Sequence, residues 1–283
     1  MTLLQAIVLG IVQGLTEFLP VSSTAHLRIV PALFGWTFHY GGHRSNDPGA
    51  AFTAVIQLGT ALAIVLYFWR ELLHVAVAWV RGLYDRSVRD SLEYRFGWYL
   101  IFATVPIAVF GLIFSHQIET GARNLWVISS ALIGFAVLLF AAERVGQRDR
   151  VEEQISTRDA VVVGTAQALA LVPGASRSGV TISAGLFRGL TRETAARFSF
   201  LLSIPAVVLS GLYEARKIGS ADGPGAGLTG VALVFAFLVG LASIAWLMRW
   251  LAGHATFVFV YYRVALGALL IVLLSTGVLK ASR

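Results

Sequence analysis

Residues 10–27 read GIVQGLTEFLPVSSTAHL, and residues 164–181 read GTAQALALVPGASRSGVT. Each stretch begins as an apolar helix, is interrupted by proline and hydroxyl residues, and continues as a second short helix. Four pairs of residues match when the stretches are aligned: Gly10 with Gly164, Gln13 with Gln167, Leu15 with Leu169, and Ser22 with Ser176. Interrupted helices at corresponding places in two halves of a membrane protein point to a site near the bilayer midplane. We therefore predict re-entrant hairpins at residues 1–34 and 159–190, in inverted repeats spanning residues 1–143 and 144–283.

The composition is that of a polytopic membrane protein. The 283 residues are 57% apolar and 13% charged, with a mean hydropathy of +0.76, whereas soluble domains are about 45–50% apolar and about 25% charged. Soluble enzymes, disordered chains and coiled coils are excluded, and the absence of cysteine excludes thiolate chemistry. Six apolar runs are predicted to span the bilayer as helices: residues 50–69, 97–114, 124–142, 198–213, 227–248 and 255–279. The fold class is all-α, in a single membrane domain of residues 1–283.

Arginine is distributed unevenly between the two sides of this topology. The loops at residues 70–95, 144–158, 188–197 and 249–254 share one side and contain most of the arginines. Since Lys and Arg gather in cytoplasmic loops, we expect this side to be cytoplasmic and both termini to lie outside. Residues 71–95 are expected to lie along the cytoplasmic interface. The net charge of +7 is thus a sign of topology and does not indicate a nucleic-acid partner.

Glu17 lies at the end of an apolar helix, where a carboxylate is costly and therefore predicts function. Gln13 lies one turn earlier on the same face. Together they could offer oxygen ligands to a hard cation. The alternative is an interfacial glutamate paired with a surface arginine.

Ser22, Ser23 and His26 follow the first interruption. One serine is expected to cap the next helix. His26 lies one turn beyond them, so that a serine and the histidine could form a nucleophile–base pair. A histidine that only fills the core is the alternative.

The second interruption contains Gly174 in a Pro-Gly turn, followed by Ser176 as a predicted N-cap. Arg177 then falls in the first helical turn, where the helix dipole disfavours a cation unless an anion binds there. An arginine also offers a fork of donors that suits phosphate. Ser178 and Thr181 could add hydroxyl groups to such a phosphate site.

Arg263 lies inside the last predicted span. We expect it to form a structural ion pair with Glu143 or Glu214, with a role at the site as the alternative.

The motifs QGLTEFLPVSSTAHL (residues 13–27) and LVPGASRSGVT (residues 171–181) resemble those of the bacterial undecaprenyl-diphosphate phosphatase family, also called bacitracin-resistance proteins. The resemblance covers essentially the whole chain. It implies hydrolysis of undecaprenyl diphosphate, and of other polyprenyl diphosphates, to the monophosphate and inorganic phosphate. This reaction recycles the lipid carrier for peptidoglycan synthesis in the bacterial inner membrane and confers bacitracin resistance. The resemblance also implies a divalent cation, Mg²⁺ or Ca²⁺, and a site that opens outward. No protein partner is implied.

These roles can be distributed over the two hairpins. Glu17 and Gln13 would hold the cation, and Arg177 would clamp phosphoryl oxygens. Ser23 would attack phosphorus or position water, and His26 would take the proton. The phosphate cradle would be completed by Ser22, Gly174, Ser176, Ser178 and Thr181. The nucleophile remains open between Ser23, Ser22, His26 and water.

Two other functions are considered. A lipid-linked or ion-coupled transporter would share the inverted-repeat architecture. A phosphatidic-acid-type phosphatase is disfavoured, because that family needs a His–Asp pair after its Ser-Arg motif. Here His254 is the only histidine after Arg177, and no aspartate follows it.

Overall fold

A computed structural model describes residues 1–40, 43–114, 117, 123–218 and 225–281. Within these residues the chain forms eleven α-helices and one small β-hairpin, which confirms the predicted all-α class apart from the hairpin. The helices are α1 (Leu3–Thr16), α2 (Ser23–Leu33), α3 (Ala50–Tyr67), α4 (Trp69–Tyr84), α5 (Leu92–Ile113), α7 (Leu125–Val145), α8 (Thr157–Gln167), α9 (Arg177–Phe187), α10 (Arg192–Ala215), α11 (Ala226–Gly253) and α12 (Phe257–Ser275). Short 3-10 segments are η1 (Arg86–Val88), η2 (Glu152–Gln154) and η3 (Ala168–Leu171).

The hairpin was not predicted. Strands β1 (Phe38–Tyr40) and β2 (His43–Ser45) pair antiparallel, with Phe38 opposite Ser45. Three-residue strands are too short to show an alternating pattern in the sequence. Phe38 is fully buried beneath α1 and α3, in a cluster with Leu9 and Phe52, and so anchors the hairpin.

Six helices are long and apolar enough to cross a membrane, as predicted: α3, α5, α7, α10, α11 and α12. Two of them begin earlier than their apolar runs. Helix α5 starts five residues earlier because Ser91 accepts a hydrogen bond from the Tyr94 amide, and α10 starts six residues earlier because Thr191 accepts one from the Thr194 amide. Hydroxyl N-caps in the polar loops therefore extend both helices beyond their apolar segments.

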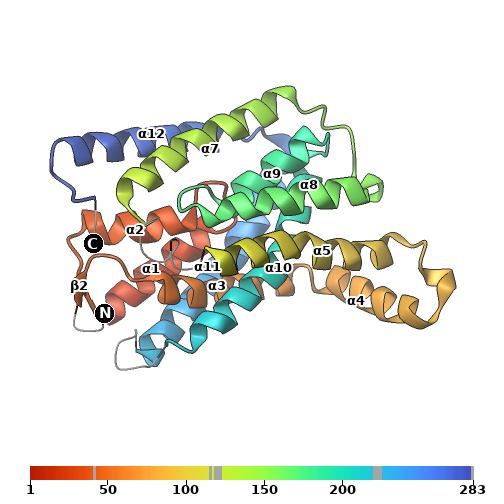
Figure 1. Ribbon diagram of the computed structural model, residues 1–283, viewed down its shortest axis with the longest axis horizontal. Coiled ribbons are helices and arrows are strands. Elements are labelled where there is room, and N and C mark those ends of the chain that lie inside the picture. The colour runs from red at the N-terminus through yellow and green to blue at the C-terminus, as the bar shows by residue number, and fades with distance from the viewer. Residues whose placement is uncertain (41–42, 115–116, 118–122, 219–224, 282–283) are drawn as a thin grey trace.

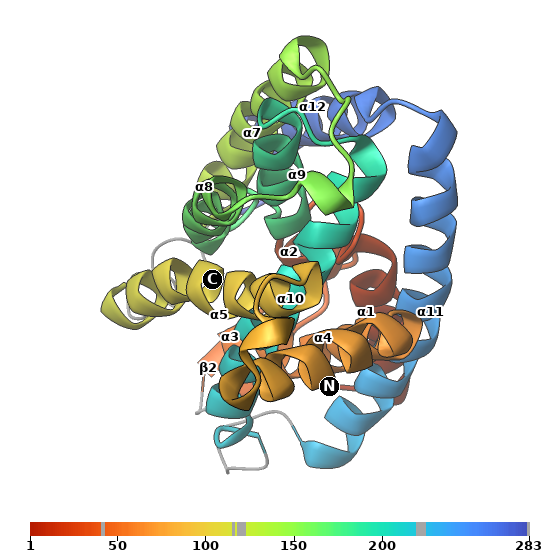
Figure 2. The same ribbon diagram turned by 90° about the vertical axis from the view of Figure 1, so that its right-hand side faces the viewer.

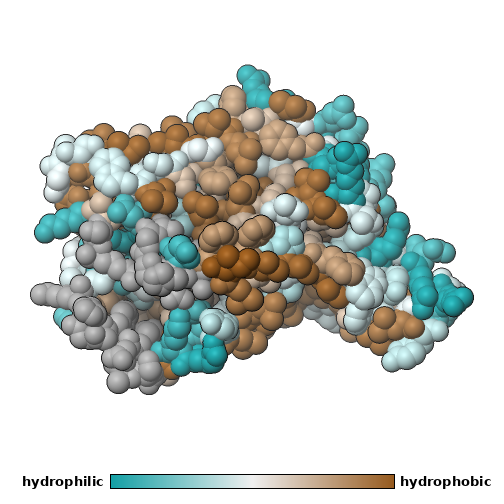
Figure 3. Space-filling model, viewed as in Figure 1, coloured by the Kyte–Doolittle hydropathy of each residue, from teal (hydrophilic) through white to brown (hydrophobic). Residues whose placement is uncertain are grey.

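Both described ends of the chain lie beside the β-hairpin, at one end of the molecule (Figure 1). The α4–α5 and α7–α8 connections lie at the opposite end. The long helix α11 runs along the right-hand side of Figure 2 from the bottom of the view to the top. Apolar side chains cover the middle of the face in Figure 3, and polar ones gather at the end with the α4–α5 and α7–α8 connections.

Two interrupted helix pairs, α1–α2 and α8–α9, lie inside this arrangement. Each first helix packs closely on a spanning helix at a glycine. A Cβ at Gly10 would lie 2.3 Å from the Ala232 carbonyl oxygen on α11, and one at Gly164 would lie 2.5 Å from Ala103 Cα on α5. The matching glycines of the two sequence stretches thus allow the same kind of helix contact.

Candidate active site

The first interruption lies between α1 and α2. Glu17 is the C-cap of α1, and its amide donates to the Gln13 carbonyl oxygen at 3.0 Å. Pro20 has no amide hydrogen and disfavours helical backbone before it, which explains why the helix stops here. Ser22 then caps α2, and its hydroxyl accepts from the Ala25 amide at 3.4 Å.

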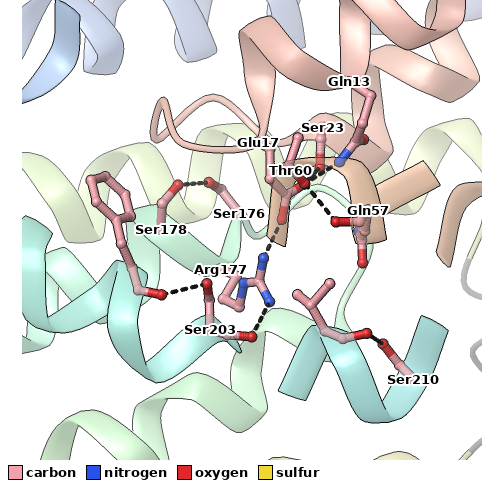
Figure 4. A network of polar contacts seen from close by, with 12 residues as sticks. Gln13, Glu17, Ser23, Gln57, Thr60, Ser176, Arg177, Ser178, Ser203 and Ser210 are labelled. Atoms are coloured by element: carbon pink, nitrogen blue, oxygen red, sulfur yellow. Dashed lines mark hydrogen bonds and ion pairs between the residues drawn. The ribbon is translucent and has the colours of Figure 1, made fainter. Parts of the chain in front are cut away.

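The Glu17 carboxylate is the centre of a buried polar cluster (Figure 4). Its Oε2 accepts from Gln13 Nε2 at 2.8 Å and from the Ser23 hydroxyl at 2.6 Å. Its Oε1 forms an ion pair with Arg177 Nη2. The structure therefore brings four of the predicted site residues into one cluster. They supply an amide (Gln13), a carboxylate (Glu17), a hydroxyl (Ser23) and a guanidinium (Arg177).

Arg177 comes from the second interruption, 160 residues along the chain from Glu17. Gly174 has a φ of +97°, which makes the turn after Pro173. Ser176 caps α9 and accepts from the Gly179 amide at 3.2 Å, so Arg177 begins the helix as predicted. The Arg177 Nη1 also donates to the Ser203 carbonyl oxygen on α10 at 3.4 Å. One guanidinium edge thus faces Glu17 and the other faces α10.

The two interruptions contact each other directly. The Ser178 hydroxyl donates to the Leu19 carbonyl oxygen at 3.1 Å and lies 3.1 Å from the Ser176 hydroxyl. Ser176 and Ser178 therefore lie beside the first interruption, near the Glu17–Arg177 pair.

The two capping serines share an uncommon backbone conformation. Ser22 has φ 76° and ψ 98°, and Ser176 has φ 70° and ψ 112°. A positive φ costs a non-glycine residue about 1–3 kcal/mol and tends to occur at functional sites. These serines are also one of the four pairs matched in the sequence, so the similarity of the two stretches extends to their backbone.

His26 does not contact Ser23 as the sequence suggested. One ring nitrogen, Nδ1, lies 2.7 Å from the Ser22 carbonyl oxygen, and the other, Nε2, lies 2.6 Å from the Tyr262 hydroxyl on α12. A carbonyl can only accept, so Nδ1 bears the hydrogen and Nε2 accepts from the tyrosine when the ring is neutral. The group that accepts a hydrogen bond from Ser23 is Glu17. Tyr262 was not predicted as a site residue. Its hydroxyl group within an apolar span is the feature of the sequence that could have indicated a polar contact there.

Thr181 also lies apart from the guanidinium end of Arg177. Its hydroxyl donates to the Arg177 carbonyl oxygen at 2.7 Å and lies 2.5 Å from the Ser199 hydroxyl of α10. Thr181 therefore joins α9 to α10 beneath the site.

The prediction for Arg263 was wrong, since it pairs with neither Glu143 nor Glu214 among the described residues. Glu143 instead bonds Arg148, Arg192 and Thr256. Arg263 is fully buried, and all of its hydrogen bonds within the described residues go to backbone carbonyls. The acceptors are Pro20 at 3.2 Å, Gly174 and Ala175 at 2.9 Å each, Leu132 at 3.2 Å and Ala131 at 3.4 Å. One side chain therefore joins both interruptions to α7.

A second buried charge cluster, which was not predicted, lies near the β-hairpin. Asp47 accepts two hydrogen bonds of 2.7 Å from Arg123 and lies 3.9 Å from Arg28 on α2. Burial raises the pKa of Asp47, but the Arg123 guanidinium and neighbouring hydrogen bonds outweigh burial and hold the pKa at about 2.

The oxygen atoms at this site that could serve as ligands for a hard divalent cation are those of Glu17 and Gln13. Gln13 Oε1 is buried and accepts no hydrogen bond within the part of the chain that the structure describes, and it lies on the residue that contacts Glu17. No cluster of three or more His, Cys, Asp or Glu side chains suited to a metal occurs in the described residues. A site with one carboxylate and one amide oxygen suits Mg²⁺ or Ca²⁺ when substrate phosphate supplies the other oxygens.

The chain is similar to known proteins over nearly its full length. The family model described as "Bacitracin resistance protein BacA" matches residues 6–269. A protein of Mycobacterium sp. (strain KMS) named undecaprenyl-diphosphatase is 52% identical over 285 aligned residues, covering 99% of this chain and 100% of the relative. Proteins with the same name from Mycolicibacterium smegmatis and Chlorobium phaeovibrioides are 51% and 50% identical. Each comparison covers 99% of this chain, with 100% and 99% of the relatives, respectively.

Proposed function

The chain belongs to the bacitracin resistance protein BacA family, and from this we propose that it is a membrane phosphatase that hydrolyses undecaprenyl diphosphate. The products are undecaprenyl phosphate and inorganic phosphate, and the reaction recycles the lipid carrier for peptidoglycan synthesis. The observation that supports this most directly is the contact between Glu17 and Arg177, which joins the two interrupted helices at one buried site. The transporter alternative has no support from the relatives compared above.

The proposed architecture is an inverted repeat with two re-entrant hairpins, α1–α2 and α8–α9. Its support is the shared detail of the two interruptions: close-packed Gly10 and Gly164, and N-caps at Ser22 and Ser176 with the same positive φ. Interrupted helices at membrane depth must be buried in protein or line a cavity. Both interruptions meet this condition, because their polar atoms bond to each other and to Arg263.

We propose that the protein lies in a bacterial inner membrane with the arginine-rich loops on the cytoplasmic side. Both chain termini and the β-hairpin then lie on the outer side. The site would then open outward. The chain has no cysteine, so single cysteines can report the side directly. We expect a membrane-impermeant maleimide to label exposed Thr37→Cys in intact cells and to leave exposed Gln147→Cys unlabelled. Labelling of Gln147→Cys but not of Thr37→Cys would show that the orientation is the opposite of the one proposed.

Phosphoryl transfer depends mainly on positioning and on neutralising charge. The Arg177 guanidinium would bind phosphoryl oxygens through two parallel hydrogen bonds, and the free amides at the start of α9 would add donors. Ser176 and Ser178 lie at the same helix end and would complete the phosphate site together with Ser22 and Gly174.

Glu17 is placed to accept a proton from the Ser23 hydroxyl, which donates to it at 2.6 Å. Either that hydroxyl or a water held in its place would attack the terminal phosphorus, and the bond from this phosphorus to the bridging oxygen would break, so that undecaprenyl phosphate leaves. If the serine attacks, water must then hydrolyse the phosphoserine to release inorganic phosphate. His26, bonded through both ring nitrogens, would act nearby as a second proton acceptor after releasing Tyr262. Gln13 and Glu17 would hold a divalent cation, which when bound would neutralise diphosphate charge.

The test is phosphate release by purified protein from undecaprenyl diphosphate, with and without a chelator. Arg177→Lys and Arg177→Ala should each lose about 10²–10³ in turnover, because neither keeps the planar fork of donors. If Arg177 only balances Glu17, Arg177→Ala should lower the melting temperature, since a buried partner loses its counter-charge, and Arg177→Lys should restore both stability and turnover. A fully active Arg177→Lys protein would contradict the phosphate clamp, and absence of phosphate release by the wild type would contradict the proposed function.

A further inference from the structure

An apolar groove runs along the side of α7 that faces η3 and the second interruption. Its volume is about 770 Å³. The α7 side is lined by Trp126, Phe135 and Leu138, and the opposite side by Leu169 and Val172. From Trp126 to Leu138 the helix rises by roughly 18 Å at 1.5 Å per residue. The groove is therefore long enough for a segment of an extended hydrocarbon chain.

Small residues hollow out the middle of this groove. Gly134 lies in the interior of α7, where glycine costs about 1 kcal/mol relative to alanine. A Cβ at this position would have no atom within 4 Å, in contrast to Gly10 and Gly164, which are packed against other helices. Ser130 precedes Gly134 by one turn on the same face and is exposed. Packing against other described residues therefore does not require glycine at position 134. The space in front of Gly134 is part of the groove.

The middle of the groove lies next to the phosphate-binding residues. Ala131 lines it, and a Cβ at Gly174 would lie 3.0 Å from the Ala131 Cβ. Arg263 holds the same two segments together, because it donates to the carbonyls of Ala131 and Gly174. Val172, at the groove wall, precedes Ser176 by only four residues. Helix α7 lies beside the α8–α9 pair in both ribbon views (Figures 1 and 2). A ligand whose charged end lies at Arg177 can therefore continue into the groove.

We propose that this groove binds the first isoprene units of the prenyl chain while the diphosphate lies at Arg177. The proposal rests on the proposed phosphatase function and adds the part of the protein that recognises the lipid. A prenyl chain gains little hydrophobic free energy by leaving lipid for the groove, because lipid tails are equally apolar. The groove therefore contributes by van der Waals packing along the prenyl chain, which is the term that stabilises contacts inside a bilayer, and this packing holds the chain beside the diphosphate site.

Bulky substitutions inside the groove test this proposal. Gly134→Phe and, independently, Ser130→Phe would fill the middle of the groove from two successive turns of α7. Each should raise KM for undecaprenyl diphosphate about tenfold or more, in the range that a few packing contacts in an apolar pocket provide, with kcat changed much less. Gly134→Ala adds little volume and should behave as wild type. Gly230→Phe on α11 is the matched control, since a Cβ there also has no atom within 4 Å, and it should leave KM unchanged.

A binding measurement separates this proposal from the phosphatase function. A photoreactive farnesyl diphosphate analogue should crosslink to residues 126–138 or 169–172 of the wild type in nanodiscs, and undecaprenyl diphosphate should compete while added phospholipid should not. Crosslinking should be lost in Gly134→Phe and retained in Gly230→Phe. Unchanged KM and crosslinking in both groove variants, with wild-type melting temperatures, would overturn the proposal and show that the groove holds only membrane lipid. A wild type that crosslinks but releases no phosphate would contradict the enzyme function and leave the groove assignment standing.

Discussion

Replacing Arg263 by methionine removes a side chain that joins both interruptions to α7. Methionine keeps much of the aliphatic volume but has no donor. The carbonyls of Pro20, Gly174 and Ala175 lie outside the helices and would lose the hydrogen bonds that Arg263 gives them. Two further acceptors, on α7, belong to helix carbonyls that can also bond within the helix. The loss therefore falls mainly on the segments that position Glu17, Ser176 and Arg177.

The size of the effect follows from those three carbonyls. A buried polar group left without a partner costs about 1–3 kcal/mol. We use the lower figure for each, because removing a buried charge also removes its desolvation cost. The expected destabilisation is then about 3 kcal/mol. For a chain of this size this corresponds to a decrease in melting temperature of roughly 6–12 °C. A displacement of the interruptions by about 1 Å would in addition reduce turnover about 10²-fold.

The assay is thermal unfolding in detergent together with phosphate release on the same preparations. Arg263→Lys should recover part of the stability, since an ammonium can reach one or two of the carbonyls, but it should recover little turnover because its donors radiate from one point. Arg249→Met, which changes an exposed arginine at the end of α11, should leave both quantities unchanged. An Arg263→Met protein that melts within about 2 °C of the wild type and keeps its turnover would refute the reasoning, because it would show that the carbonyls need no donor.

Three further predictions concern two polar groups at the site and the buried Asp47 near the β-hairpin. Glu17→Gln keeps an acceptor for Ser23 but removes the negative charge, so turnover should fall about 10²-fold or more, with little rescue by added Mg²⁺. Undiminished turnover would exclude Glu17 from the chemistry. Tyr262→Phe removes the donor to the Nε2 of His26, worth about 1 kcal/mol, so turnover should fall a few-fold and the pH profile of kcat/KM should shift; an unchanged profile would assign the tyrosine to packing alone. Asp47 has a pKa of about 2 in the folded protein, below the value of about 3.9 in unfolded chains. Its stabilising effect, about 2–3 kcal/mol, should therefore be complete above about pH 5 and be lost progressively as the pH falls towards 1. Asp47→Asn should melt at a lower temperature at pH 7 and lose this pH dependence.

The elements that could be predicted are those whose signal is local. Each spanning helix is a long apolar window, and each interruption contains a proline that cannot continue a helix. The placement of Arg177 in the first turn of α9 follows in the same way from the N-cap at Ser176. The helix starts at Ser91 and Thr191 were not predicted, because a span predicted from its apolar residues ends where those residues end. The hydroxyl caps lie in the polar sequence before the apolar runs.

The elements that could not be predicted depend on contacts between distant segments. Glu17 and Arg177 were predicted to act on one substrate from two hairpins that meet, but their direct ion pair was not predicted, because spacing along the chain does not encode which side chains come into contact. Arg263 was assigned to the wrong partner because a carboxylate is visible in a sequence and a free backbone carbonyl is not. The pairing of His26 with Tyr262 was missed for the same reason, since 236 residues separate them.

The ion pair between Glu17 and Arg177 also bears on how an anionic substrate can enter a site at membrane depth. A buried charge without a partner is costly, and the pair keeps both residues neutralised in the absence of substrate. Binding of a diphosphate would give Arg177 a new partner and leave Glu17 with its hydrogen bonds from Gln13 and Ser23 alone. The remaining negative charge is that of the carboxylate and the substrate together, which a divalent cation between them would balance. Exchange of one ion pair for two, with each charge paired throughout, thus explains why a carboxylate, an arginine and a cation would be needed at the same place.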